Sequence, residues 1–157
     1  MKSRLLFLYI FLIIESLVYP QTPIGSWREH LPYNKIIMAV EGGNRIYAAT
    51  LQTVFYVDKE DNSVHKMSKV DGLSDVGISA IAYSEEAKSL VIAYSNTNID
   101  IVKNDVVFNI PDIKRKIIPG KKTINNIFIN ENMAFLSCGF GIVVIDLTRN
   151  EVSDTWL

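Results

Sequence analysis

The apolar residues of this chain gather in short runs that recur at a fixed distance. Strand-like segments of one kind occur at 45–50, 89–94 and 133–138, and segments of a second kind at 53–58, 97–102 and 141–146. The offset between successive copies is 44 residues, and the alignment needs no gap across either segment. A period of about 40 to 50 residues with several strands per unit is typical of β-propeller blades. The pattern therefore predicts three tandem repeats.

Each repeat is predicted to contain four strands. The first strands cover 35–40, 78–84 and 123–129, the second 45–50, 89–94 and 133–138, the third 53–58, 97–102 and 141–146, and the fourth 63–67, 106–110 and 151–156. Residues that favour turns separate them, as at 41–44, 85–88, 130–132, 58–62 and 146–150. No helical periodicity persists beyond the N-terminal segment, so the predicted fold class is all-β.

The third strands contain continuous apolar runs instead of alternating ones. Val54 to Val57 and Ile142 to Ile145 are the clearest cases. Such runs indicate strands covered on both faces, as in a propeller, where each blade packs between two neighbours. Three blades do not close a ring, since propellers have about four to eight. We therefore expect a partial propeller: the natural chain continues after Leu157, three copies assemble, or the gene product is incomplete, and an end at the close of a blade favours truncation.

The first 20 residues form a separate segment. Lys2 and Arg4 precede the apolar run from Leu5 to Ile14, which is the arrangement of a secretory signal peptide. The run is short for a transmembrane helix, which needs about 20 apolar residues. The predicted domains are a signal peptide at 1–20 and a propeller region at 24–157, with blades at about 27–70, 71–114 and 115–157. Export from the cytoplasm is expected.

Composition excludes several classes of protein. The chain has 157 residues, 48% of them hydrophobic, and a net charge of −1. This is far from a disordered composition, and the charge gives no general attraction to nucleic acid. A single cysteine excludes a disulfide-stapled mini-protein. The chain has no phosphate-binding glycine loop, zinc-protease motif or nucleophile elbow, so we predict that it is not an enzyme and needs no cofactor or metal.

Several strings resemble known propeller repeats. Asp71–Asp75, Ile78–Ile81 and Leu90–Ile92 resemble the blades of two-component regulator propellers. Gly72–Ile78, Ile92–Asn96, Asn109–Ile113 and Leu136–Ile142 are similar to the PorZ family, surface components of the type IX secretion system of Bacteroidetes. The resemblance covers residues 24–157.

This resemblance implies two seven-bladed propellers and a C-terminal β-sandwich signal in the whole protein, of which this chain would hold the first three blades of the N-terminal propeller. It also implies a place on the outer-membrane cell surface, reached through the periplasm. It also implies partners: a PorU-type sortase and other attachment-complex proteins, anionic lipopolysaccharide that is presented to the sortase, and the remainder of the chain's own propeller. Two other functions stay open, a carbohydrate-sensing periplasmic propeller of a hybrid two-component regulator and a propeller hydrolase or lyase. The sequence after Leu157 would distinguish the three functions. A β-sandwich sorting domain supports the PorZ-like function, a transmembrane span followed by a kinase supports the regulator, and a ring of inward His or acidic residues supports the enzyme.

A basic segment is the candidate ligand-binding site. Its five cations lie between the second and third repeats and are Lys114, Arg115, Lys116, Lys121 and Lys122. Such a cluster attracts phosphate-bearing polysaccharide, although a solvated basic loop is the simpler interpretation.

Three further residues stand out. Asn98 and Asp100 are polar where the gapless alignment places Val54 and Tyr56, or Ile142 and Val144. We expect this pair to have a structural role, bonded to a turn or backbone of an adjacent blade, with a calcium or sugar contact as the alternative. Cys138 is expected to be a buried thiol, since no second cysteine completes a zinc site and His30 and His65 occupy other repeat positions.

Overall fold

The computed structural model describes residues 33–157, and the predicted signal peptide, residues 24–32 and His30 lie outside this part. Twelve strands form three separate antiparallel sheets of four strands each. The first sheet contains β1 (Met38–Gly42), β2 (Arg45–Ala49), β3 (Val54–Asp58) and β4 (Val64–Met67). The second contains β5 (Ile78–Ser84), β6 (Ser89–Tyr94), β7 (Ile99–Lys103) and β8 (Val106–Ile110). The third contains β9 (Ile124–Asn130), β10 (Met133–Cys138), β11 (Gly141–Asp146) and β12 (Glu151–Trp156).

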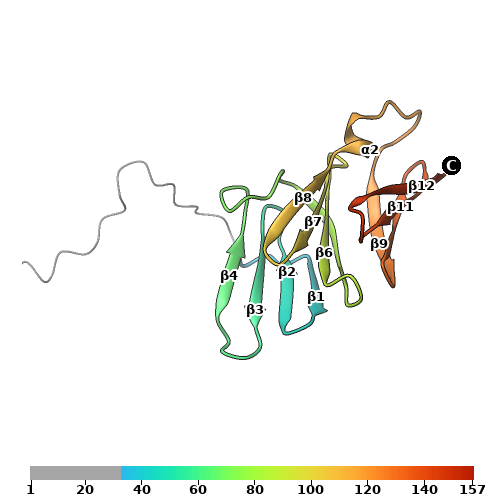
Figure 1. Cartoon of the computed structure of the whole chain (residues 1–157). Coiled ribbons are helices and arrows are strands. Elements are labelled where there is room, and N and C mark those ends of the chain that lie inside the picture. The colour runs from blue at the N-terminus through green and yellow to red at the C-terminus, as the bar shows by residue number, and fades with distance from the viewer. Residues whose placement is uncertain (1–32) are drawn as a thin grey trace, which may run out of the picture.

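The three sheets stand side by side as consecutive meanders (Figure 1). The first strand of each sheet packs against the first strand of the next, so β1 contacts β5 and β5 contacts β9. This is the arrangement of propeller blades, whose first strands line the centre of the ring. The prediction of an all-β partial propeller is confirmed. Within residues 33–157, no helix is long and apolar enough to cross a membrane.

Tight hairpins join the strands because their turn residues tolerate the left-handed backbone. Lys103 pairs with Val106, and the two residues between them, Asn104 and Asp105, have φ values of 47° and 62°. Such φ values define the primed turns that match the twist of paired strands. At the β1–β2 turn, Gly42 is required for space, since a Cβ atom there would lie 2.4 Å from Cγ of Tyr83.

Two hydrophobic clusters hold the sheets together. Between the first and second sheets, the stacked rings of Tyr47 and Tyr83 lie 5.7 Å apart in a cluster that also contains Ile92. Between the second and third sheets, Val91 and Leu136 belong to the other cluster. Every residue of β6 is buried, because this sheet has a neighbour on both faces.

The first and third sheets, unlike the second, are not buried on both faces. The third strands were predicted to be covered on both faces, but Phe55 and Val57 are only half-buried and Ile142 is 38% exposed. The prediction holds for β7, where Ile99 to Val102 are buried. It is wrong for Phe55, Val57 and Ile142, because within residues 33–157 the first and third sheets each have one neighbouring sheet. The far face of the third sheet presents Phe128, 63% exposed, and Trp156, 51% exposed.

The third strand of the second repeat is shifted by one residue. Asp100 pairs with Ile92. The residues that occupy the place of Ile92 in the other repeats, Ala48 and Leu136, pair with Phe55 and Val143. The prediction that Asn98 and Asp100 replace Val54 and Tyr56 is therefore wrong, since Asp100 occupies the place of Phe55.

An extra residue in the hairpin causes this shift. In the first repeat the turn closes with a bond from the Thr50 amide to the Thr53 carbonyl, whereas the second repeat bonds the Tyr94 amide to the Asn98 carbonyl. Thr97, in this longer turn, has φ of 66°. Because side chains alternate between faces, a shift of one residue moves the strand's whole polar set to the opposite face. Asn98 and Asp100 therefore face the first sheet.

Candidate functional site

The candidate site is the segment 111–123, which runs from the outermost strand of the second sheet to the innermost strand of the third. We call it the basic crossover. It begins with Pro111 and one turn of helix, α2 (Asp112–Arg115), whose Ile113 is 3% exposed and packs into the cluster between the sheets. A proline before the first turn fits this start, because its missing amide proton is not needed there. Figure 1 shows α2 and the following loop at one end of the sheets, beside β9.

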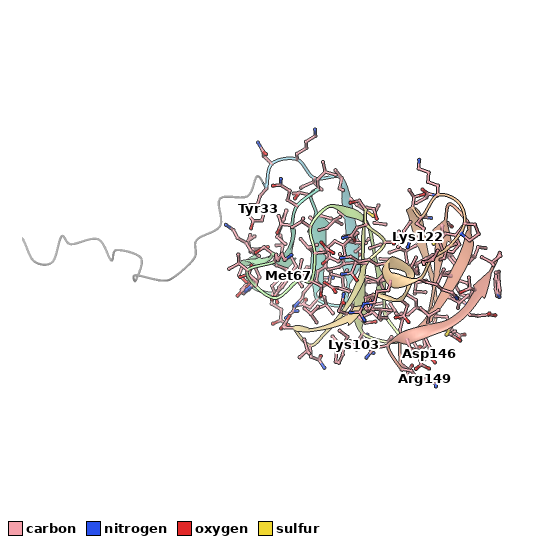
Figure 2. The ribbon with its side chains drawn as sticks, turned by 90° about the horizontal axis from the view of Figure 1, so that it is seen from above. Tyr33, Met67, Lys103, Lys122, Asp146 and Arg149 are labelled. Atoms are coloured by element: carbon pink, nitrogen blue, oxygen red, sulfur yellow. The ribbon has the colours of Figure 1, made fainter. Side chains whose placement is uncertain are left out.

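Two of the five cations hold the crossover in place. The Lys122 ammonium donates to the carbonyl oxygens of Ile113, Lys114 and Lys116, at 2.9, 3.0 and 2.8 Å. These carbonyls lie in and just after the last turn of α2, where unpaired carbonyl groups collect. The Lys114 ammonium forms an ion pair with Asp75, at 2.6 Å. Both lysines are therefore anchors, and Figure 2 places Lys122 beside the ribbon of this segment.

The other three cations point to solvent. Arg115, Lys116 and Lys121 are exposed, and their side chains make no hydrogen bond or ion pair with any other residue of the part that the structure describes. Charges left without an internal partner are available to an external anion. The structure thus separates the predicted five-residue cluster into two anchors and three binding candidates.

Asp75 connects the crossover to the loop between the first and second sheets. Burial opposes ionisation of its carboxyl group, but hydrogen bonds from Lys114 and Asn96 outweigh this and lower the pKa to about 2. Asn98, 3% exposed, lies close to the same carboxylate, with its amide nitrogen at 3.4 Å, and accepts a bond from Asn109. One set of hydrogen bonds and an ion pair therefore joins the loop that contains Asp75, the start of β7 and α2.

Asp100 lies at the buried end of this set and is fully buried. Its carboxylate accepts hydrogen bonds from the Tyr94 hydroxyl at 2.7 Å, the Ser74 amide at 2.8 Å and the Asn109 side chain at 2.9 Å. Burial and the bond to Asp100 raise the pKa of Tyr94, so the hydroxyl remains a donor. Both members of the Asn98–Asp100 pair thus have protein partners.

Sequence reasoning missed Asp75, Asn96 and Asn109 as members of this network. One signal was present: Asn109 interrupts the apolar pattern of its strand, as Asn98 and Asp100 do in theirs. The partnership itself joins residues up to 39 positions apart. No local pattern encodes such a distance.

The remaining candidates show no reactive arrangement. Cys138 is half-buried, and burial raises the pKa of its thiol to about 11. His65 lies in the first sheet, where its ring stacks on Tyr56. Among residues 33–157, no three His, Cys, Asp or Glu side chains are grouped so that they could hold a metal ion.

Removal of the Lys122 anchor should loosen the crossover. Lys122→Met keeps the length of the side chain but leaves three carbonyl groups without their donor, so we expect the free energy of unfolding to fall by about 1 to 2 kcal/mol. Limited proteolysis should cut the crossover faster than in the parent chain. Lys121→Met, the adjacent exposed cation, is the control, and equal cleavage of both variants would contradict the anchoring role.

Comparison with known proteins assigns the family. The family model described as the N-terminal β-propeller domain of PorZ, of the type IX secretion system, matches residues 46–157. The chain belongs to this family. A solved PorZ structure, described as an essential bacterial surface component of the type IX secretion system of Porphyromonas gingivalis, has 37% sequence identity and a TM-score of 0.76. The alignment covers 80% of this chain and 17% of that PorZ chain, so the chain spans about a sixth of the length of its relative.

Two other similar structures support only the fold. The WD40 repeats of RRP9 share 13% identity with a TM-score of 0.63, over 83% of this chain and 40% of that one. Apo AztD from Citrobacter koseri shares 12% identity with a TM-score of 0.58, over 78% of this chain and 34% of that one. No curated protein matches the chain. The comparisons therefore give the chain the family and the propeller fold of PorZ, which is itself described as a type IX secretion protein.

Proposed function

We propose that this PorZ-family propeller is a non-enzymatic scaffold and ligand-binding domain of the type IX attachment complex on the cell surface. It binds anionic lipopolysaccharide and presents it to a PorU-type sortase. The observation that carries the proposal is the set of three cations without internal partners, Arg115, Lys116 and Lys121, on a crossover that two other lysines hold in place. The family match favours this function over the sensor of a hybrid two-component regulator.

The anchors make the cations an organised surface. Because Lys122 and Lys114 fix the backbone on both sides of Arg115 and Lys116, less conformational entropy is lost when an anion binds than at a mobile loop. The phosphate groups of an anionic polysaccharide would accept charge-assisted bonds from these side chains. Binding of this kind needs no catalytic geometry and leaves the glycan intact for the sortase.

The open sheet faces suit partners of the scaffold. On the far face of the third sheet, the ring of Phe135 lies beside the rings of Phe128 and Trp156. The far face of the first sheet exposes Ile46, 42%, and Val64, 60%. Apolar faces of this kind are covered by partners in assembled proteins. We assign them to the remaining blades of the chain's own propeller, which leaves the basic crossover accessible to ligand and attachment-complex proteins.

Charge reversal tests the proposal. Arg115→Glu with Lys116→Glu is expected to weaken binding of delipidated anionic polysaccharide, measured by calorimetry, by about tenfold or more for each charge-assisted bond lost. Lys35→Glu with Lys69→Glu changes the net charge equally at exposed sites on the first sheet side and is expected to leave binding unchanged. Equal affinity of the parent chain and the crossover variant would overturn the proposal.

A further inference from the structure

A groove lies between the basic crossover and the third sheet. Its volume is about 770 Å³, and it lies where α2 and the loop that follows face the β10–β11 turn, β11 and β12. We call it the seam groove. Its volume is in the range of sites that hold a small molecule.

The lining combines two chemistries. Its walls are mostly apolar, formed by residues from the crossover, the β10–β11 turn and the outer strands: Ile113, Ile118, Phe140, Val143 and Val152. Arg115 and Lys116 line the same groove. Asp112 is the acidic residue among the described lining residues, so the positive charges exceed the negative one.

This combination fits an amphiphile. A free phosphate or a soluble glycan would bind the two cations but leave the apolar walls exposed to water. A neutral apolar molecule would use the walls and leave the cations without an anion. A molecule with an anionic head group and an acyl chain satisfies both, since its phosphate accepts bonds from Arg115 and Lys116 while its chain removes apolar wall from water.

We propose that the seam groove binds the acyl chain of a phosphate-bearing lipid whose head group lies on Arg115 and Lys116. This inference rests on the proposed function and extends it, because it makes the lipid end of the ligand the part that enters the propeller. The glycan then extends outward past Lys121, where it is accessible to another protein.

Dodecyl phosphate below its critical micelle concentration is the probe, titrated into the full chain by calorimetry. Each methylene that enters the groove should raise affinity by about fourfold, so dodecyl phosphate should bind more than tenfold tighter than octyl phosphate. Glycerol 3-phosphate carries the head without the chain, and dodecyl maltoside carries the chain without the phosphate. Both should bind more than tenfold more weakly, and an affinity independent of chain length would overturn the proposal.

Two adjacent residues of β12 locate the binding site. Thr155 lines the groove, whereas Trp156 contacts Phe135 on the open far face of the third sheet. Thr155→Trp fills the groove and should weaken dodecyl phosphate binding more than tenfold, and Thr155→Leu, a smaller change, should weaken it severalfold. Trp156→Ser should leave it unchanged. Loss of binding in Trp156→Ser, with none in the Thr155 variants, would place the lipid on the open face and overturn the proposal.

The probes separate this inference from the proposed function. In one outcome, delipidated polysaccharide fails to bind while dodecyl phosphate binds with the expected dependence on Thr155. This result would contradict the proposed glycan recognition and support the lipid-binding groove. If polysaccharide binds through Arg115 and Lys116 but the affinity for alkyl phosphates does not depend on chain length, the lipid-binding groove is contradicted and the proposed function is not. Urea unfolding of each variant confirms that it is folded before either result is used.

Discussion

Replacement of Asp100 by alanine is expected to lower the free energy of unfolding by about 3 to 5 kcal/mol. The carboxylate is fully buried and accepts three hydrogen bonds, from Tyr94, Ser74 and Asn109. Alanine leaves all three donors in the interior without an acceptor, and each unsatisfied donor costs about 1 to 3 kcal/mol. The midpoint and slope of urea unfolding measure the change.

Two further variants define the origin of this loss. Asp61→Ala makes the same chemical change at an exposed turn, where the carboxylate accepts a bond from the Ser63 amide, and should cost less than about 1 kcal/mol. Asp100→Asn keeps one carbonyl oxygen and should lie between Asp100→Ala and the parent chain. If Asp100→Ala unfolds at the same urea concentration as Asp61→Ala, water replaces the carboxylate and the network does not hold the loop to the sheet.

Replacement of Leu136 by alanine is expected to cost about 3 kcal/mol. Leu136 is fully buried in β10, in the cluster between the second and third sheets. The substitution removes apolar contacts and leaves a cavity that the two sheets close only in part, because both are held by their own strand pairing. Urea unfolding measures the loss of stability.

An exposed valine provides the control. Val64 is 60% exposed on the first sheet, so Val64→Ala should change the free energy of unfolding by less than about 0.5 kcal/mol. A cost below about 1 kcal/mol for Leu136→Ala would show that the third sheet moves to fill the space. The interface between the second and third sheets would then be more deformable than its packing indicates.

The cross-links at the seam argue for a stiff interface. Ser84 donates its hydroxyl to the Glu131 carbonyl at 2.6 Å, and Lys103 donates to the Leu147 carbonyl. Figure 2 shows Lys103 close to Asp146 and Arg149, at the turn that follows β11. These bonds join the second and third sheets by their hairpin ends. They lie at the opposite end of the third sheet from the β10–β11 turn that lines the groove, so they fix how the two sheets sit without taking part in the groove itself.

The strands of this protein could be predicted from the sequence alone. Apolar runs such as Val54–Val57, bounded by turn residues and repeated at 44 positions, indicate strand identity locally. The structure places the strands within two residues or so of the predicted ones, apart from β1, which begins at Met38 instead of 35. The resemblance carried by Gly72–Ile78 and the other strings also identified the family.

Tertiary structure decided what the polar residues do. A gapless alignment of the repeats predicts that Asp100 corresponds to Tyr56. The extra residue in the turn that contains Thr97 places Asp100 on the opposite face of the strand, toward the first sheet. The sequence grouped Lys114 and Lys122 with three other cations, and the fold made them anchors through Asp75 and three carbonyl groups. Strand formation depends on neighbours along the chain, whereas a hydrogen bond or ion pair depends on which distant segments meet, and only the packed sheets determine that.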